Sequence, residues 1–272
     1  MPEEGKYIYC IIQTDREEHF SSPAIGGRGD RVHSIGYQDV GAVVSASPVA
    51  QYSISRDNTL AHMRVMEEIM AGRVMLPVKF NTVASGNKDG SVEERIRREI
   101  LAARYKELKG LLARMTDKVE LGLKALWVQM EPVYMKILDD HREIRELKQR
   151  IMQGISLGSL DQRIELGDMV KSSLDEKRKA EEEAILKNLN GSFGDLRRNK
   201  IFGESMIMNA AFLVDRKQIP AFDAGIERLI SAHAEKIRFK YVGPVPPCNF
   251  VELVINLTDR RDERSVGSSH GI

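Results

Sequence analysis

The sequence has little cysteine: Cys10 and Cys248 are the only two in 272 residues. That number is too small for a disulfide framework in a chain of this size. Long hydrophobic runs are absent as well, since no apolar stretch approaches the ~18–20 residues that span a bilayer. The N-terminal MPEEGKYIYCIIQTD lacks the basic start and the small-residue cleavage site of a signal peptide. We therefore expect a cytosolic protein without a membrane segment.

An excess of charge of either sign is also missing. The chain has 41 basic and 40 acidic residues, a net charge of +1. Proteins that bind nucleic acids usually carry a clear basic excess or stripe, so the balance argues against a nucleic-acid partner. With 42% hydrophobic and 30% charged residues, the chain can bury real cores. Its length exceeds the usual ~100–150 residues of one domain, so we expect two domains.

Spacings typical of catalytic and metal sites do not occur either. None of the six histidines belongs to H-E-x-x-H or H-x-H, and neither cysteine belongs to C-x-x-C. His62 and His233 lie in predicted helices with apolar faces, where a core-edge or surface role is expected. The glycine-rich Gly26–Asp30 segment leads toward a strand rather than a helix, so it is a poor phosphate loop. Cys10 lies in an apolar run and is expected to be inert. The sequence thus predicts no metal, no cofactor, no catalytic residue and no enzyme.

The first 130 residues are predicted to form a ferredoxin-like α+β domain with the element order β-ββ-α-β-α-β. A capping box from Ser91 to Glu94 opens its second helix, and Pro77 indicates that the strand around it is an edge strand or contains a bulge. The predicted elements are a strand at Tyr7–Gln13, a hairpin at Val32–Ser47 with its turn near Gln38–Gly41, a helix with Leu60, Met63, Met66, Ile69 and Met70 on one face, a strand at Val74–Ala84, a helix at 91–115 and a strand at Lys118–Met130.

Residues 131–258 are predicted to form a second α+β domain that carries a helical hairpin at about 131–190. The second helix of the hairpin has only Ala180 as an apolar residue between positions 175 and 183, which is typical of a solvated face. Residues 259–272 are polar and are expected to form a disordered tail. The remaining elements are a strand at Glu204–Arg216, a helix with Phe222, Ile226, Leu229 and Ile230 on one face, and strand-like runs within Arg238–Ile255.

The last of these segments, RFKYVGPVPPCNFVELVI, is interrupted between Gly243 and Pro247 by a glycine and three prolines. Proline has no backbone donor and fixes φ near −65°, so these residues break a strand ladder and stiffen a bend. Two interpretations follow: a rigid corner that turns the last strand back onto the sheet, or a rigid apolar loop that contacts a partner. The corner is favoured, because prolines at strand breaks mostly serve the fold.

Four segments in this order resemble the gas vesicle protein F/L family, with the F-like branch favoured: YIYCIIQ, VMLPVKFNTVA, VELGLKALW and FKYVGPVPPCNFVELVI. The resemblance extends from about Tyr7 to Ile255, and its most specific motif is Gly243-Pro244-x-Pro246-Pro247-x-x-Phe250. In the Leu-Pro-x-x-Phe-Gly pattern, the family usually has arginine and glycine where Lys79 and Asn81 stand. Cys248 replaces an aromatic residue that is common after the double proline. These departures indicate a divergent member.

The resemblance implies an accessory, minor structural protein of gas vesicles, which are hollow, protein-walled buoyancy organelles. It implies a role in vesicle assembly through contacts with the main shell protein and other accessory proteins, at the shell and in the cytoplasm. It also implies a two-domain α+β build with no cofactor and no reaction. Family-motif residues that could take part in interactions are Pro77, Lys79, Phe80, Gly243, Pro244, Pro246, Pro247 and Phe250.

We further expect the motifs around Pro77 and Pro244 to lie close together at the domain interface. Two other functions stay open at this point. One is a ligand-binding regulator with a ferredoxin-like domain, which would sense a small molecule between the domains. The other is an enzyme whose site residues converge from distant parts of the sequence.

Overall fold

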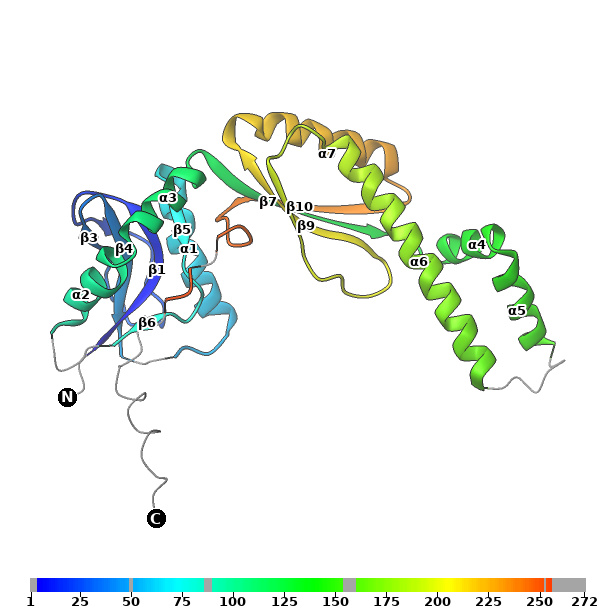
Figure 1. Ribbon diagram of the computed structural model, residues 1–272, viewed down its shortest axis with the longest axis horizontal. Coiled ribbons are helices and arrows are strands. Elements are labelled where there is room, and N and C mark those ends of the chain that lie inside the picture. Colours follow the sequence, from blue (N-terminus) through cyan, green and yellow to red (C-terminus); the bar gives the residue numbers. More distant parts are fainter. Residues whose placement is uncertain (1–3, 49–50, 86–89, 154–159, 252, 256–272) are drawn as a thin grey trace, which may run out of the picture. The chain divides into compact units, whose positions relative to one another are not determined.

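The computed structural model describes residues 4–48, 51–85, 90–153, 160–251 and 253–255 (Figure 1). The chain divides into two compact units. The first comprises residues 1–119 together with 245–272, and the second comprises residues 120–244. Each unit has its own β-sheet and its own helices, which confirms the predicted α+β class.

The first unit is built on a six-stranded sheet in which β1 (Gly5–Gln13) is a central strand. All side chains from Tyr7 to Ile12 are buried, which accounts for the unbroken apolar run. The strand order is β2-β3-β4-β1-β5, with β6 also paired to β1. The other strands are β2 (His19–Phe20), β3 (Val32–Tyr37), β4 (Val40–Ser47), β5 (Met75–Pro77) and β6 (Val83–Ala84).

Two features predicted for this sheet are confirmed. The hairpin of β3 and β4 turns at Gln38, which has a φ of 53°, and Asp39. The segment that contains Pro77 is at the edge of the sheet, since β5 ends the strand order. However, the single strand expected over 74–84 is two short strands, β5 and β6, which pair with different parts of β1.

The helices of the first unit are α1 (Arg56–Gly72), α2 (Val92–Arg95), a π-helical stretch (Ile96–Ala102) and α3 (Tyr105–Met115). The predicted capping box is present, because the Ser91 hydroxyl accepts a hydrogen bond from the Glu94 amide at 3.2 Å. The predicted apolar face of α1 is only partly right. Leu60 is exposed, whereas His62 and Val65 are buried. Both sets of positions have helical spacing, and the pattern left open how the helix is rotated.

The second unit contains a four-stranded sheet with the order β10-β7-β9-β8. Its strands are β7 (Lys118–Trp127), β8 (Asp195–Arg198), β9 (Met206–Asp215) and β10 (Ile237–Val245). The strand predicted at 118–130 was expected to complete the first domain, and that expectation is wrong, because β7 pairs in the second sheet. The division of the chain therefore falls at residue 119 rather than at 130. The alternation of β7 predicts a strand but does not predict its partners.

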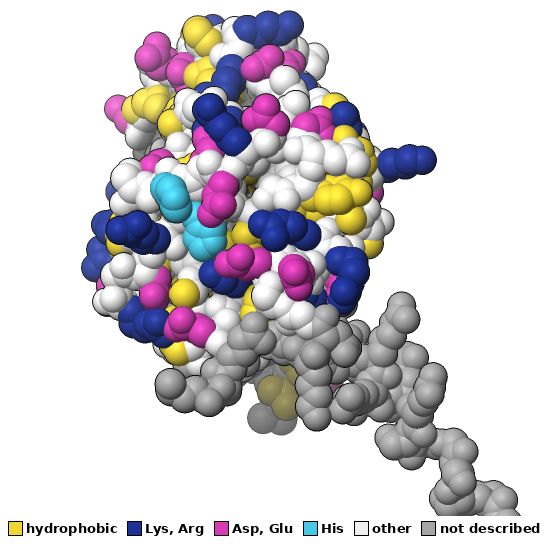
Figure 2. All heavy atoms as spheres, turned by 90° about the vertical axis from the view of Figure 1, so that its left-hand side faces the viewer, with side chains coloured by type: hydrophobic (Ala, Val, Ile, Leu, Met, Phe, Trp, Pro, Cys, Tyr) yellow, Lys and Arg dark blue, Asp and Glu magenta, His cyan; other side chains and the backbone are white. Residues whose placement is uncertain are grey.

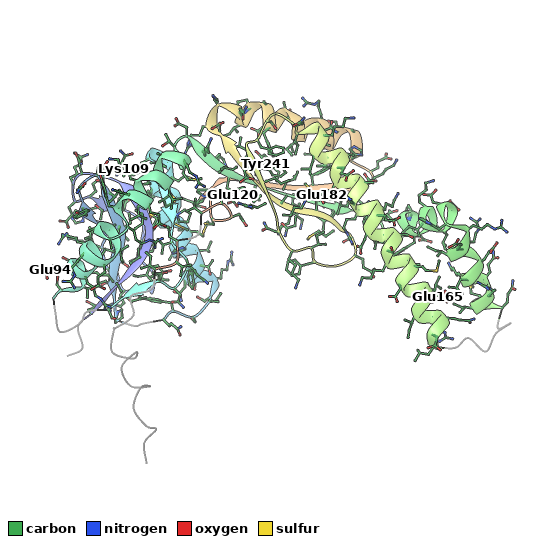
Figure 3. All side chains as sticks on the ribbon, in the orientation of Figure 1. Glu94, Lys109, Glu120, Glu165, Glu182 and Tyr241 are labelled. Atoms are coloured by element: carbon green, nitrogen blue, oxygen red, sulfur yellow. The ribbon has the colours of Figure 1, made fainter. Side chains whose placement is uncertain are left out.

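The helices of the second unit are α4 (Glu131–Asp140), α5 (Arg142–Met152), α6 (Leu160–Asn188) and α7 (Ile219–His233). The backbone of His141 is extended and separates α4 from α5. Both of these helices contact α6, and their buried side chains include Ile137, Ile144 and Leu147. Glu165 lies near the beginning of α6, whereas Glu182 lies beside the sheet (Figure 3). The predicted hairpin turn and the predicted tail fall outside the described residues.

Aromatic rings form the core between α7 and the second sheet. The Phe222 ring centroid lies 5.1 Å from that of Phe212 on β9 and 5.9 Å from that of Tyr241 on β10. Ile226 and Leu229 are buried as predicted, but Ile230, which was expected on the same face, is exposed. In the described part of the chain, no helix has the length and the apolar composition needed to cross a bilayer.

Candidate functional site

The first family motif lies in the first unit, beside the centre of the sheet. Pro77 is buried and faces Cys10 across the pairing of β5 with β1. The next residue, Val78, continues the contact by donating its amide hydrogen to the carbonyl of Tyr9 at 3.1 Å. Lys79 is exposed, and Phe80 is half-buried. Of these motif residues, Lys79 is therefore the one that the fold leaves accessible to a partner.

A buried aromatic cluster surrounds Phe80. Its ring centroid lies 5.5 Å from that of His62 and 6.3 Å from that of Tyr7. The hydroxyl of Tyr7 accepts a hydrogen bond from the Asn81 amide and lies 3.1 Å from Nδ1 of His62. Burial lowers the pKa of His62 to about 4, so the imidazole is neutral near pH 7 and Nδ1 can accept from Tyr7. His62 is thus a residue of the core.

Asn81 stands where the family pattern usually has glycine, and its backbone conformation accounts for this departure. It has a φ of 72°, a left-handed conformation that glycine adopts most easily and that asparagine tolerates better than other residues. Its side chain also holds Tyr52 from both sides, because Oδ1 accepts from the Tyr52 amide at 2.7 Å and Nδ2 donates to the Tyr52 carbonyl at 3.0 Å. Asparagine therefore meets the same backbone requirement and adds two hydrogen bonds.

The second family motif begins at the end of β10. Gly243 has a φ of 129°, and a Cβ there would lie 2.8 Å from Cδ2 of Leu121 and 2.9 Å from the carbonyl oxygen of Glu120. Only glycine fits this position. A cis peptide bond joins Gly243 to Pro244, and both residues are exposed.

The double proline of the motif belongs to the first unit. Pro246 and Pro247 are buried, and the Pro247 carbonyl accepts hydrogen bonds from the amides of Phe250 and Val251, both at 3.1 Å. Leu253 then forms a parallel bridge with Val78, directly after Pro77. The segment is thus one strand followed by a compact turn, and its described residues after the turn belong to the first unit rather than to the sheet of β10. The bridge brings Leu253, which follows the second motif, beside the first motif. The predicted closeness of Pro77 and Pro244 stays a prediction.

The remaining candidates for a chemical role are the metal-ligating side chains and the two cysteines. The described residues contain no group of three or more His, Cys, Asp or Glu side chains that could hold a metal ion. Cys10 is buried and burial raises the pKa of its thiol, as expected for an inert cysteine, while Cys248 is exposed. Figure 2 shows basic and acidic side chains interspersed over one face, with two histidines side by side. The rings of His19 and His33 lie 6.2 Å apart on paired strands.

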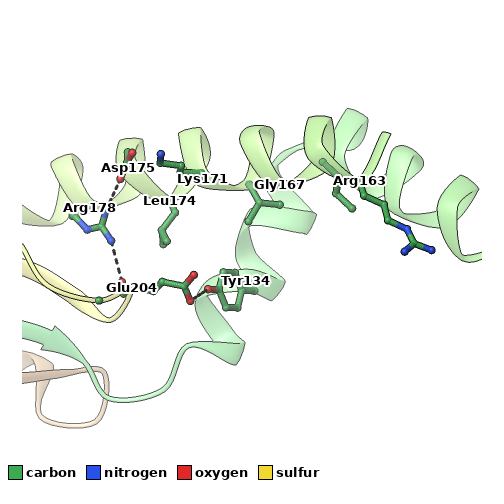
Figure 4. Close-up of a pocket in the computed structure, with 11 residues that line it drawn as sticks. Tyr134, Arg163, Gly167, Lys171, Leu174, Asp175, Arg178 and Glu204 are labelled. Atoms are coloured by element: carbon green, nitrogen blue, oxygen red, sulfur yellow. Dashed lines mark hydrogen bonds and ion pairs between the residues drawn. The ribbon is translucent and has the colours of Figure 1, made fainter. Parts of the chain in front are cut away.

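One feature of the second unit could not be read from the sequence: a groove of about 590 Å³ that follows α6 (Figure 4). Along α6 it is lined by Arg163, Leu166, Gly167, Val170, Lys171, Leu174, Asp175 and Arg178. Its other side is formed by Tyr134 of α4 and by Gly203 and Glu204 of the loop that precedes β9. The lining positions on α6 recur every three or four residues and therefore share one face of the helix.

Hydrogen bonds fix one end of this groove. The Tyr134 hydroxyl donates to the Glu204 carboxylate at 2.7 Å, which raises the pKa of Tyr134. The Arg178 guanidinium donates to the carbonyls of Glu204 at 3.0 Å and Met206 at 2.8 Å, and it pairs with Asp175. Arg178 also lies over the Trp127 ring, 5.9 Å from its centroid. The positive charge of Arg178 is therefore engaged within the protein.

Arg163 and Lys171 differ from Arg178 in this respect. Both are exposed on the groove face of α6, and neither forms a hydrogen bond or an ion pair with another of the described residues. In Figure 4 the Arg163 side chain extends away from the Tyr134–Glu204 contact. The sequence signal for the groove was the spacing of Leu166, Val170 and Leu174 in a charged helix, but its other side comes from residues distant in the sequence.

Together these observations define a class: a two-unit α+β protein whose second unit carries a grooved helical segment. A family model described as gas vesicle synthesis protein GvpL/GvpF matches residues 5–252. The chain therefore belongs to the GvpF/GvpL family of gas vesicle proteins, as the resemblance predicted.

Individual relatives agree with this assignment. Gas vesicle protein F from Streptomyces sp. (strain CB03234) is 28% identical over 249 residues, which cover 90% of this chain and 99% of the relative. Gas vesicle protein F from Dolichospermum flosaquae is 26% identical over 224 residues, 82% of this chain and 88% of the relative. The crystal structure of gas vesicle protein GvpF from Anabaena sp. PCC7120 superposes with a TM-score of 0.77 at 22% identity, covering 93% of this chain and 100% of that one. The chain shares its fold, and the family gives it a role in gas vesicles.

Proposed function

We propose that this protein acts in gas vesicle assembly as an accessory, minor structural protein of the F-like branch that binds the main shell protein and other gas vesicle accessory proteins. Its place would be at the vesicle shell and in the cytoplasm, and its function would reside in surfaces rather than in a catalytic site. The single observation that carries the proposal is the family match over residues 5–252.

Exposed apolar side chains of the second unit support a role in binding. Met135 of α4 is 52% exposed, Met152 of α5 77%, Ile164 of α6 53%, and Phe202 of the loop before β9 63%. The exposed part of each of these side chains gains no burial within the described fold, so a partner that covered it would add hydrophobic stabilisation. Contact with a small, apolar shell subunit would bury them.

The family motifs are proposed to contribute differently. The exposed residues Lys79, Gly243 and Pro244 could reach a partner, whereas the buried residues Pro77, Pro246 and Pro247 shape the fold. Phe80 and Phe250 are half-buried, so their exposure is intermediate between those of the two groups.

The test is retention of the main shell protein on the immobilised full-length chain. We expect the wild type to retain it and a variant with Ile201→Ser and Phe202→Ser to retain less, because both side chains are exposed in one loop. Ile54→Ser is the control for loss of an exposed apolar side chain outside the second unit, to which the contact is assigned, because Ile54 is 87% exposed and belongs to the first unit. If the folded wild type retains no shell protein, the proposed function is wrong.

A further inference from the structure

We propose that the groove along α6 is a docking site for an amphipathic helix with an acidic polar face, presented by a partner protein. This inference rests on the proposed function, because it names the surface and the partner chemistry that assembly contacts would use. It draws on the shape of the groove, on its apolar floor and on two cations, Arg163 and Lys171, that form no ion pair with the described residues.

The shape of the groove fits a helix. Its lining on α6 extends from Arg163 to Arg178, which at a rise of 1.5 Å per residue corresponds to about 22 Å, or roughly four turns. A volume of about 590 Å³ takes the side chains of one apolar helix face rather than a whole helix. Helices that bind in this way insert residues at positions i, i+3 or i+4, and i+7 into an apolar groove.

The floor of the groove is apolar and contains an unfilled position. Leu166, Val170 and Leu174 form the stripe, and Gly167 lies within it. A Cβ added at Gly167 would meet no atom within 4 Å. Glycine in the middle of a long helix lowers helix stability relative to alanine, and no packing contact of the protein requires it here. Its absent side chain leaves space for a side chain of the partner.

The charges select an acidic partner. Arg163 and Lys171 are eight residues apart on the groove face, with no ion pair to other described residues. The two acidic groups of the lining are engaged, Asp175 by Arg178 and Glu204 by the Tyr134 hydroxyl. Carboxylates two helical turns apart on a partner helix would meet both free cations. Exposed charges of this kind affect partner selection and salt dependence more than they affect raw affinity.

The experiment uses two synthetic 15-residue helical peptides with the same leucine face, one with glutamates and one with lysines on the polar face. Binding of each labelled peptide to the full-length chain is measured by fluorescence anisotropy at low and high salt. We expect the acidic peptide to bind the wild type and the basic peptide to bind at least about tenfold more weakly. Raising the salt concentration should narrow the difference.

Two variants test the groove itself. Gly167→Leu places a side chain over the floor of the groove. Because a Cβ at this position meets no atom within 4 Å, we expect the variant to fold and to bind the acidic peptide at least tenfold more weakly. Gly167→Ala is the matched control and should bind nearly as the wild type does. A variant with Arg163→Glu and Lys171→Glu should lose the preference for the acidic peptide and favour the basic one. Circular dichroism of each variant confirms the fold.

The outcomes separate this inference from the proposed function. If both peptides bind equally, or if Gly167→Leu binds the acidic peptide as tightly as the wild type does, the groove is not an acidic-helix site, whatever the shell protein does. If the wild type does not retain the shell protein, the proposed function fails, whatever the peptides do. Binding of a small molecule that the Gly167→Leu variant loses, without any peptide binding, would also overturn the inference.

Discussion

The buried His62 predicts a specific dependence of stability on pH. Burial lowers its pKa from 6.5 to about 4 in the folded protein. Between these two values the unfolded chain binds more protons than the folded chain, so the free energy of unfolding falls as the pH falls. At about 1.4 kcal/mol for each pKa unit, the difference between the two pKa values corresponds to about 3 kcal/mol of unfolding free energy. This stability is fully present above pH 6.5 and is lost by about pH 4.

The perturbation is His62→Asn, which keeps a hydrogen-bond acceptor near Tyr7 but does not titrate. Urea unfolding is followed at pH 7, 5.5 and 4 by the near-ultraviolet circular dichroism of the tyrosines, most of which lie in the first unit. The fluorescence of Trp127, the one tryptophan, reports the second unit. We expect the wild type to lose about 3 kcal/mol more than the variant between pH 7 and 4 in the tyrosine transition.

Other titratable groups do not produce this difference in stability between the wild type and His62→Asn. Burial also lowers the pKa of His33, but His33 is present in both proteins and cancels in the comparison. Hydrogen bonds from Arg73 lower the pKa of Glu18 to about 2, so its contribution is present above about pH 4.5 and is lost as the pH falls toward 2. Equal slopes for wild type and variant between pH 7 and 4 would refute the assignment of His62 as a neutral, buried imidazole.

Further substitutions test two family-motif positions, Gly243 and Asn81. Gly243→Ala should destabilise the second unit by about 2–4 kcal/mol, because it combines a strained φ with a backbone contact under 3 Å; Gly167→Ala, in the same unit, should stabilise it by about 1 kcal/mol. Urea unfolding followed by Trp127 fluorescence measures both, and a neutral Gly243→Ala would contradict the steric argument. Asn81→Ala should destabilise the first unit more than Asn81→Gly does, since both lose the hydrogen bonds to Tyr52 but only alanine is strained at a φ of 72°. Tyrosine circular dichroism during unfolding measures the difference, and the reverse order would show that backbone strain is not the deciding factor.

Local patterns predicted the elements well where a single face is buried. The capping box at Ser91 and the strand alternation of β7 were both readable, because they depend on neighbours in the sequence. The pairing of β7 was not readable, because the choice between two sheets depends on contacts with β9 and β10, which are distant in the sequence. One practical result is that cutting the chain near Met130 would remove β7 from its sheet. Point variants of the full chain are therefore the better tool.

The candidate sites were also only partly predictable from the sequence. The proline motifs could be found in the sequence, because proline and glycine restrict the backbone wherever they occur. Their separation into exposed and buried members could not, since it follows from the return of Leu253 to Val78. The groove also escaped prediction. Its floor on α6 has a recognisable spacing, but Tyr134 and Glu204 come from other elements, and only the fold brings them beside Leu174.

The return of the C-terminal segment to the first unit has a consequence for synthesis on the ribosome. Chains emerge from their N-terminal end at about 5–20 residues per second, and domains usually fold as units during this process. Here residues 120–244 are complete before Val251 and Leu253, two buried residues of the first unit, are synthesised. The segment translated first is thus completed last, and a chain that ends prematurely lacks the residues that close the edge of its first sheet.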